Sequence, residues 1–315
     1  PAAAIGGTMA PIELEEGYDK DYVAAVNIAS APTGQLIPPS NTLIVYATVA
    51  GSVSVAALFM AGYIPGIAWG ISLMFIAGYM AKKRGYVSTF SVTPKEAIKV
   101  LWDALPSLLL IIIVIGGILK GVFTATEGSA IAVVYALILS LCYRSLKIKD
   151  LPSIILSSCK TTCIVIFMIG VSSIMSWVMA YTMIPTAIAN AMLSLSSNKY
   201  VILLLMNVIL LVVGTFMDPT PAVLIFTPIF LPICQSFGMD PVQFGIMIVF
   251  NLCIGTITPP VGVILFTGCK VVGISIEGVI KTLLPFFAAI AVVLLLVTYV
   301  PAMSMWIPSM LGLVK

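Results

Sequence analysis

Long stretches without charge limit the folds open to this sequence. No charged side chain occurs between Pro241 and Cys269, and four further stretches share this property: residues 22–81, 161–198, 219–239 and 282–314. Each is at least about as long as the roughly 20 residues that a helix needs to cross a bilayer. Hydrophobic residues make up 61% of the chain and charged residues only 9%, unlike a soluble domain. The sequence therefore predicts an all-α integral membrane protein, because a β-barrel would show short alternating segments.

Basic clusters indicate the orientation of the chain. "KKR" at 82–84 and "RSLKIK" at 144–149 mark cytoplasmic loops by the positive-inside rule, and the two apolar segments between them return the chain to the same side. The net charge of +3 comes from such short clusters, so we expect a lipid bilayer and no nucleic acid as partner. The chain has no histidine and no CxxC pair, which argues against zinc, haem and redox sites.

An internal repeat emerges when the chain is aligned with itself at an offset of 221. The alignment pairs rare turn-forming residues in one register: Gly34 with Gly255, Pro38 and Pro39 with Pro259 and Pro260, and Ser54 with Ser275. On this alignment Pro1 corresponds to Ala222, so we expect the chain to be a fragment whose first hairpin tip precedes Pro1.

The repeat predicts two parts. Residues 1–81 are expected to be the remainder of the first repeat, with a span over 22–48 broken at 34–39 and a return span over 58–81. Residues 82–315 are expected to be the second repeat, with these elements: an interfacial amphipathic helix at 91–105, spans near 106–120, 127–143 and 160–182, a re-entrant hairpin at 199–236, a broken helix at 241–270 and a final span at 282–301. Counting crossings between Gly17 and Gly238 gives an odd number, which predicts inverted repeats, the architecture of secondary transporters.

The predicted hairpin carries an isolated carboxylate. Residues 200–213 would rise only about 21 Å as a helix, too little to span the hydrocarbon core, and "GTFMDPTP" then forms a tip. Asp218 is the only acidic residue between Asp150 and Asp240. A carboxylate inside a membrane is a candidate for cation binding, but Asp218 before Pro219 is also placed to cap the returning helix. Both interpretations remain open from the sequence.

The two double-proline breaks are the candidate binding site. In "GTITPPVG" the incoming arm can offer the carbonyls of Gly255 and Thr256 to Na⁺, while Thr258 caps an outgoing arm that starts at Pro259 or Pro260. The positive end of that second arm suits a substrate carboxylate. The first copy, "SAPTGQLIPPSN", repeats the plan with three further polar residues: Thr33, Ser40 and Asn41. The alternative is a pair of structural kinks.

These segments resemble a known family. "GTFMDPTPAVLIFTPIFLPICQSFGMDPVQFGIMIVFNLCIGTITPPVG" resembles the signature of the large membrane subunit of tripartite ATP-independent periplasmic (TRAP) transporters, DctM-like proteins. "PTGQLIPPSNTLIVYATVAG" is similar to the first broken helix of that family. "GVFTATEGSAIAVVYAL" resembles its TPTEAA motif and departs from it at Ala125 and Gly128.

The resemblance implies an elevator-type, Na⁺-driven importer of an organic acid such as a dicarboxylate, a sialic acid or a sugar acid. It implies a multi-pass protein of the bacterial inner membrane that works with a small membrane (Q) subunit and a periplasmic substrate-binding protein (P). It places Na⁺ and substrate at the hairpin tip, 214–220, and at the breaks, 33–41 and 255–262. Expected Na⁺ ligands are Gly34, Gly214, Asp218, Thr220, Gly255, Thr256 and Thr258. Expected substrate contacts are Thr33, Pro38, Pro39, Ser40, Asn41, Pro259, Pro260 and Gly262.

Other functions make different demands on the sequence. Another Na⁺/carboxylate symporter family of the same architecture would use the same breaks. A passive anion channel would show a ring of charged or carbonyl-bearing residues around a continuous pore. An intramembrane aspartyl protease would need a second aspartate to share a proton with Asp218. We therefore expect a transporter and not an enzyme, with Na⁺ as coupling ion and no organic cofactor.

Overall fold

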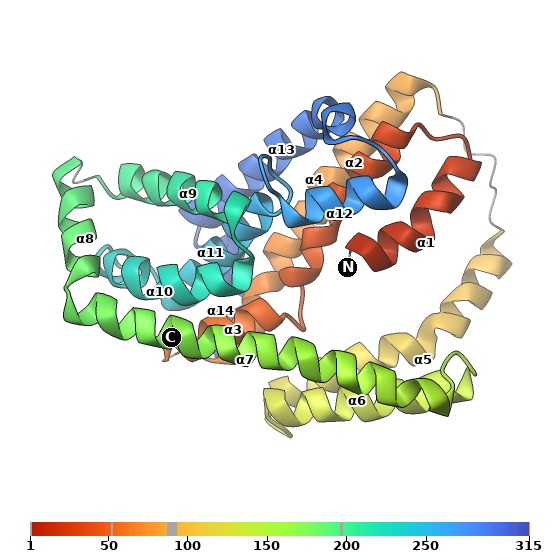
Figure 1. The fold of residues 1–315 in the computed structure, drawn as a ribbon, viewed down its shortest axis with the longest axis horizontal. Coiled ribbons are helices and arrows are strands. Elements are labelled where there is room, and N and C mark those ends of the chain that lie inside the picture. The colour runs from red at the N-terminus through yellow and green to blue at the C-terminus, as the bar shows by residue number, and fades with distance from the viewer. Residues whose placement is uncertain (1, 52, 87–92, 196–197, 315) are drawn as a thin grey trace. The chain divides into compact units, whose positions relative to one another are not determined.

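The computed structural model describes residues 2–51, 53–86, 93–195 and 198–314, and these contain helices and no strand (Figure 1). The chain divides into two compact units, one of residues 1–87 with 172–315 and one of residues 88–171. The α-helices are α1 (Ala2–Glu15), α2 (Lys20–Ser30), α3 (Asn41–Ala50), α4 (Val55–Arg84), α5 (Pro94–Leu119), α6 (Ala125–Cys142), α7 (Leu151–Tyr181), α8 (Ile184–Leu195), α9 (Lys199–Phe216), α10 (Pro219–Ser236), α11 (Pro241–Gly255), α12 (Val263–Val272), α13 (Ile276–Tyr299) and α14 (Ala302–Met310). Two 3₁₀ turns, η1 (Ala31–Gln35) and η2 (Ile148–Asp150), complete the described elements.

Several helices have the length and apolarity of membrane spans. Six such helices occur among the described residues: Val55–Arg84, Lys95–Leu119, Ala125–Cys142, Lys199–Phe216, Pro219–Ser236 and Ile276–Tyr299. They confirm the prediction of an all-α, multi-pass membrane protein. The helix predicted at 160–182 is present as α7 but begins earlier, at Leu151.

Helix boundaries repeat at the offset of 221. The starts of α2 and α11 correspond, as do those of α4 and α13 and the ends of α1 and α10. Ser54 and Ser275, which this offset pairs, each accept a hydrogen bond from the backbone at the start of their helix. Gly17 and Gly238 both have positive φ, at 86° and 74°. The division at 81/82 into two repeats stays a prediction, because compact units are defined by contacts and not by internal similarity.

Packing within the first unit is reciprocal between the two corresponding sets of helices. Helix α1 contacts α12, and its counterpart α10 contacts α3; likewise α2 contacts α13, and α11 contacts α4. Figure 1 shows α1 beside α12. When each helix of one set is replaced by its counterpart in the other set, each of these contacts becomes another observed contact. Such reciprocity is a property of a two-fold, isologous arrangement.

Helix α11 forms the centre of this unit. Every residue from Val242 to Gly255 is buried. The Trp69 and Phe250 rings lie 4.6 Å apart, and the Tyr46 hydroxyl donates to the Pro241 carbonyl at 2.6 Å. Because an apolar helix buried on all sides cannot move independently of its neighbours, α11 holds its own break in a fixed relation to α3 and α4.

The second unit corrects one prediction. An interfacial helix at 91–105 followed by a separate span at 106–120 is wrong, because α5 runs unbroken through Pro106; residues 91 and 92 lie outside the described residues. Pro106 removes one backbone donor but does not end the helix, as is common in membrane helices. The Tyr135 hydroxyl of α6 donates to the Pro106 carbonyl at 2.7 Å.

The hairpin differs from its predicted dimensions. The first arm, α9, has 18 residues and not the 14 predicted, which makes it about 27 Å long. The predicted arm length of 14 residues was therefore wrong, whereas re-entrance stays a prediction. The tip is also shorter than predicted: Gly214 belongs to α9, Pro219 and Pro221 to α10, and only Met217 and Asp218 connect the arms. Packing of α9 against α11 outweighs the low helix propensity of the glycine.

A cluster of charged side chains links α2, α4 and α13 in the first unit. The Arg84 guanidinium at the end of α4 binds both carboxylate oxygens of Asp21 on α2, at 2.8 and 2.6 Å, and also contacts Asp19 at 3.1 Å. The Thr282 hydroxyl of α13 donates to Asp21 as well. The hydrogen bond from Arg84 holds the pKa of Asp21 at about 2, against an ordinary value of 3.8. Three helices from both predicted repeats thus meet at one carboxylate.

Replacing Asp21→Asn is expected to lower the melting temperature of the detergent-solubilised protein by roughly 2–4 °C, because an ion pair that is about a quarter exposed contributes about 1 kcal/mol. The depressed pKa means that this contribution is complete above about pH 4 and disappears as the pH falls toward 2. Asp103→Asn, on exposed α5, is the matched control. Equal melting temperatures for the Asp21→Asn variant and the parent at pH 7 would contradict the role of this pair.

Candidate functional site

Two interrupted helices occur where the sequence predicts them. Helix α2 ends at Ser30, passes through η1 and irregular residues 36–40, and resumes as α3 at Asn41. Helix α11 ends at Gly255 and resumes as α12 at Val263 after irregular residues 256–262. Both interruptions contain a cis peptide bond, Pro38–Pro39 in the first and Pro259–Pro260 in the second. The prediction of two matched broken helices is therefore confirmed at the level of the backbone.

One carbonyl in each interruption already accepts two backbone hydrogen bonds. Thr33 O accepts from the backbone N–H groups of Leu36 and Ile37, at 3.1 and 2.9 Å. Thr256 O accepts from Ile264 and Leu265 of α12, at 3.0 and 3.3 Å. A carbonyl has two lone pairs, so both oxygens are fully used in this arrangement.

Gly255 has a less occupied carbonyl. Its oxygen accepts from the Thr258 N–H at 3.0 Å, and no second donor to it is found among the described residues. One lone pair therefore remains for a cation. Of the two carbonyls that the sequence proposed as ligands, Gly255 can bind without rearrangement, whereas Thr256 would first have to release α12.

The hairpin packs directly against the second interruption. A Cβ atom added to Gly255 would lie 2.3 Å from the carbonyl carbon of Gly214, so these two backbones touch where no side chain fits. The Gly262 N–H also donates to the Thr215 carbonyl at 3.1 Å. These contacts bring Gly214, Gly255, Thr256 and Gly262 together, as the sequence predicted for the hairpin and the second break.

A second contact joins the two interruptions. The Cys253 thiol of α11 donates to Gln35 Oε1 of η1 at 3.1 Å, and the Ser40 hydroxyl donates to the Gln35 carbonyl. The first break is thereby hydrogen-bonded to the last turn of α11, which directly precedes the second break. Gly34, Pro38, Pro39 and Asn41 lie in or beside this linked segment, and Thr33 Oγ1 donates back to Ser30 O at 2.6 Å.

The capping prediction for the second break is wrong. Helix α12 begins at Val263 and not at Pro259 or Pro260, and Gly262, with φ of 47°, occupies its N-cap. The Thr258 hydroxyl instead donates backward to Ile254 O at 2.7 Å. A proline disfavours helical geometry in the residue before it, so consecutive prolines followed by a left-handed glycine delay the helix. In the first copy Ser40 does cap, accepting from Leu43 N at 3.3 Å.

Asp218 occupies the helix N-cap at the hairpin tip. Its Oδ1 accepts from the Thr220 N–H at 3.1 Å, and the residue is exposed. The capping interpretation is confirmed. A carboxylate accepts through four lone-pair positions, so a cap leaves capacity for a cation and the second interpretation stays a prediction.

Sequence reasoning missed a buried polar network beneath the second break. Asn251, one turn before Gly255, donates through Nδ2 to both Asn207 O and Asn207 Oδ1 of α9, at 2.9 and 2.8 Å. Asn207 in turn donates to Thr298 Oγ1 of α13 at 3.0 Å. Asn251 is fully buried, and its Oδ1 has no hydrogen-bond partner among the described residues. The available signal was the presence of single asparagines in the apolar segments "LLMNVIL" and "VFNLCIG".

Comparison with known proteins identifies the family. The family model for "Tripartite ATP-independent periplasmic transporter, DctM component" matches residues 1–303. The chain belongs to this family. It is therefore a permease subunit of a TRAP transporter and not an enzyme, as the resemblance of its motifs predicted.

Individual relatives agree with this membership. The chain is 52% identical over 309 residues to the uncharacterised protein YgiK of Salmonella typhimurium, covering 98% of this chain and 71% of that protein. It is 40% identical over 306 residues to the isethionate TRAP transporter permease protein DctMQ of Oleidesulfovibrio alaskensis, covering 96% and 48%. It is 36% identical over 312 residues to the C4-dicarboxylate TRAP transporter large permease protein DctM of Pseudomonas aeruginosa, covering 99% and 73%.

The contact between Gly214 and Gly255 can be tested by overpacking. Gly255→Ala places a methyl group against the α9 backbone, which cannot rotate away, and is expected to destabilise the protein by roughly 1–3 kcal/mol and to abolish transport. Gly78→Ala is the control, because an added Cβ meets no atom within 4 Å. A Gly255→Ala protein that melts and transports like the parent would show that the hairpin does not rest on the break.

Proposed function

We propose that this TRAP permease subunit is the Na⁺-coupled importer of an organic acid anion in the bacterial inner membrane. The observation that carries the proposal is the pair of matched interruptions, which the Cys253–Gln35 contact joins and which the hairpin covers at Gly214. Irregular backbone at membrane depth is tolerated where it is buried or lines a polar site, and paired breaks in two repeats point to a binding site.

Substrate binding is assigned to the starts of the resumed helices. Helices α3 and α12 each begin after a double proline, so their positive dipole ends suit a carboxylate or sulfonate. In α12 the Ile264 and Leu265 N–H groups would first have to leave the Thr256 carbonyl. The proposed contacts in the first break are Thr33, Pro38, Pro39, Ser40 and Asn41, and those in the second are Pro259, Pro260 and Gly262. Gly262 serves here because the absence of a side chain leaves the start of α12 approachable.

Sodium binding is assigned to neutral oxygens around the second break and the hairpin. Na⁺ is a hard cation that favours carbonyl, amide and hydroxyl oxygens. The Gly255 carbonyl has a lone pair to give, and Asn251 Oδ1 is a buried acceptor without a partner, so these residues fit the ion. Gly34, Gly214, Asp218, Thr220, Thr256 and Thr258 complete the proposed set, with Thr256 requiring that α12 first release its carbonyl.

The proposed mechanism is that of an inverted-repeat elevator, and the packing of the helices supports it. The reciprocal contacts of the two helix sets support a two-fold relation between them, and a two-fold axis in the membrane plane would invert one set. Division of the chain into two compact units supports movement of one unit as a body. The bound ion and anion would travel with the hairpin and both breaks.

Partners follow from the tripartite family. We propose that the chain works with a small membrane subunit and a periplasmic substrate-binding protein. Two of the relatives are named as permeases for isethionate and for C4-dicarboxylates, both small organic anions. An anion site made of backbone N–H groups and helix dipole ends distinguishes such ligands weakly. We therefore assign the selection among anions to the binding protein.

Uptake measurements test the coupling. The natural full-length protein, reconstituted in liposomes with its small subunit and loaded binding protein, is expected to accumulate substrate only when an inward Na⁺ gradient is present. Replacing Na⁺ by K⁺ should remove uptake. Equal uptake in both media would contradict coupling, and uptake without any gradient that saturates poorly would favour a channel.

The double proline of the second break can be tested separately. Pro259→Ala combined with Pro260→Ala is expected to lower transport at least tenfold with a melting temperature close to that of the parent, because the freed backbone can extend helix α11 or α12 into the site. Pro106→Ala, which removes a proline from the interior of α5, is the control. Normal transport by the double variant would refute the binding role of this break.

A further inference from the structure

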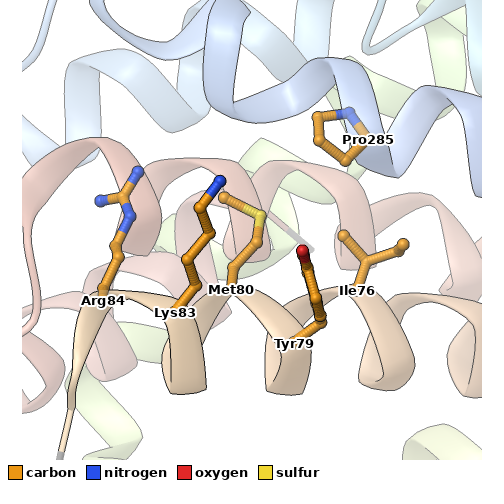
Figure 2. A pocket seen from close by; sticks show the side chains of 6 residues that line it. All are labelled: Ile76, Tyr79, Met80, Lys83, Arg84 and Pro285. Atoms are coloured by element: carbon orange, nitrogen blue, oxygen red, sulfur yellow. The ribbon is translucent and has the colours of Figure 1, made fainter.

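A cavity lies beside the basic end of α4, away from both breaks. Its volume is about 420 Å³. Helix α13 contributes Pro285 to the lining, and α4 contributes Ile76, Tyr79, Met80, Lys83 and Arg84. Figure 2 shows the Lys83 ammonium and the Tyr79 hydroxyl extending from α4 toward the α13 side, where Pro285 lies. The cavity thus combines an apolar floor, formed by Ile76, Met80 and Pro285, with a polar rim.

The rim carries positive charge that the protein does not neutralise. Arg84 is engaged by Asp21 and Asp19, as described above. Lys83 is exposed, and among the described residues no hydrogen bond or ion pair involves its ammonium group. Lys281 is also exposed and without such a partner, and it lies four residues before Pro285 on the same face of α13. Within the described part of the chain, Lys83 therefore brings an unpaired ammonium group to the rim, and Lys281 lies one helical turn from Pro285 of the lining.

The position of the cavity along α4 favours a phospholipid over a soluble anion as its ligand. The triplet at 82–84 marks the cytoplasmic end of α4 by the positive-inside rule, so the rim lies at the level of the inner-leaflet headgroups. Below it, α4 exposes a row of large side chains, with Met74, Phe75 and Tyr79 each 67–75% exposed. A soluble anion would use only the rim, whereas a phospholipid would use the rim and the apolar floor together.

We propose that the groove between α4 and α13 binds an anionic phospholipid, with its phosphate on Lys83 and Lys281, its ester region at Tyr79 and an acyl chain over Ile76, Met80 and Pro285. Basic pockets between helices on the cytoplasmic side suit such headgroups. The bound lipid bridges α4, the return span of the first predicted repeat, and α13, the final span of the second, next to the Asp21–Arg84–Thr282 cluster. This inference does not depend on Na⁺ coupling.

Native mass spectrometry of the full-length protein tests the headgroup contact, with phosphatidylglycerol and phosphatidylcholine as probes. The parent should prefer phosphatidylglycerol, and Lys83→Gln combined with Lys281→Gln should lower that preference about thirtyfold, since each lysine contributes roughly a fivefold factor. Lys147→Gln combined with Lys149→Gln, which removes two lysines from another cytoplasmic cluster, is the matched control and should leave the preference intact. An unchanged preference in the Lys83/Lys281 variant would overturn the proposal, as would competition by inorganic phosphate at the lipid concentration.

A second measurement places the lipid directly and does not need the charge variant to fold. Tyr79→Trp puts a fluorophore in the groove of protein that keeps both lysines. Its emission, measured in nanodiscs as the difference from the parent, should be quenched more strongly by phosphatidylglycerol with brominated acyl chains than by brominated phosphatidylcholine. Equal quenching by the two lipids would show bulk bilayer contact only and would overturn the assignment.

Discussion

Backbone hydrogen bonding at the two interrupted helices is the constraint on which the first unit depends. Water cannot pair these groups within a bilayer, so neighbouring protein must do so. Thr33 O and Thr256 O each accept two N–H groups from their own segment, and Thr215 of the hairpin accepts from Gly262. Such pairing requires the hairpin to approach within backbone contact, which explains glycine at both 214 and 255. Among the described residues, the Gly255 carbonyl keeps one lone pair and Asn251 Oδ1 has no partner, so both are available to a ligand.

The two helix sets share a backbone plan but differ in the chemistry of their ends. At the start of α2, Asp21 binds Arg84 and Thr282 in a partly exposed charged cluster. At the corresponding start of α11, the offset places Gln243 opposite Tyr22, and Gln243 Nε2 donates to the Thr298 carbonyl at 3.2 Å within a buried neutral network. Charge at one end and neutral amides at the other suit a molecule whose cytoplasmic side is marked by basic residues. The proposed lipid groove adds to the charged end.

Much of the fold could be predicted from the sequence, because prolines and glycines indicate where helices are interrupted and stretches without charge indicate where the chain lies in the membrane. Those signals located both interruptions and the turn at Asp218 that joins α9 and α10, and the offset of 221 matches helix boundaries. They failed where tertiary packing decides: α9 continues through Gly214 because α11 packs against it, α5 continues through Pro106, and α12 starts after Gly262. For the site, sequence alone found the breaks but not Gln35, Asn207 or Asn251, since a polar residue in an apolar run does not reveal its partner.

The central claim is that both breaks and the hairpin tip form one cation-dependent site, and hydrogen exchange tests it most directly. Amide exchange of the natural full-length protein would be compared in Na⁺ and in K⁺ at equal ionic strength, without substrate. The account predicts that Na⁺ slows exchange together in three segments: 33–43, 214–222 and 256–265. Identical exchange in the two salts, or protection confined to one break, would contradict a shared site.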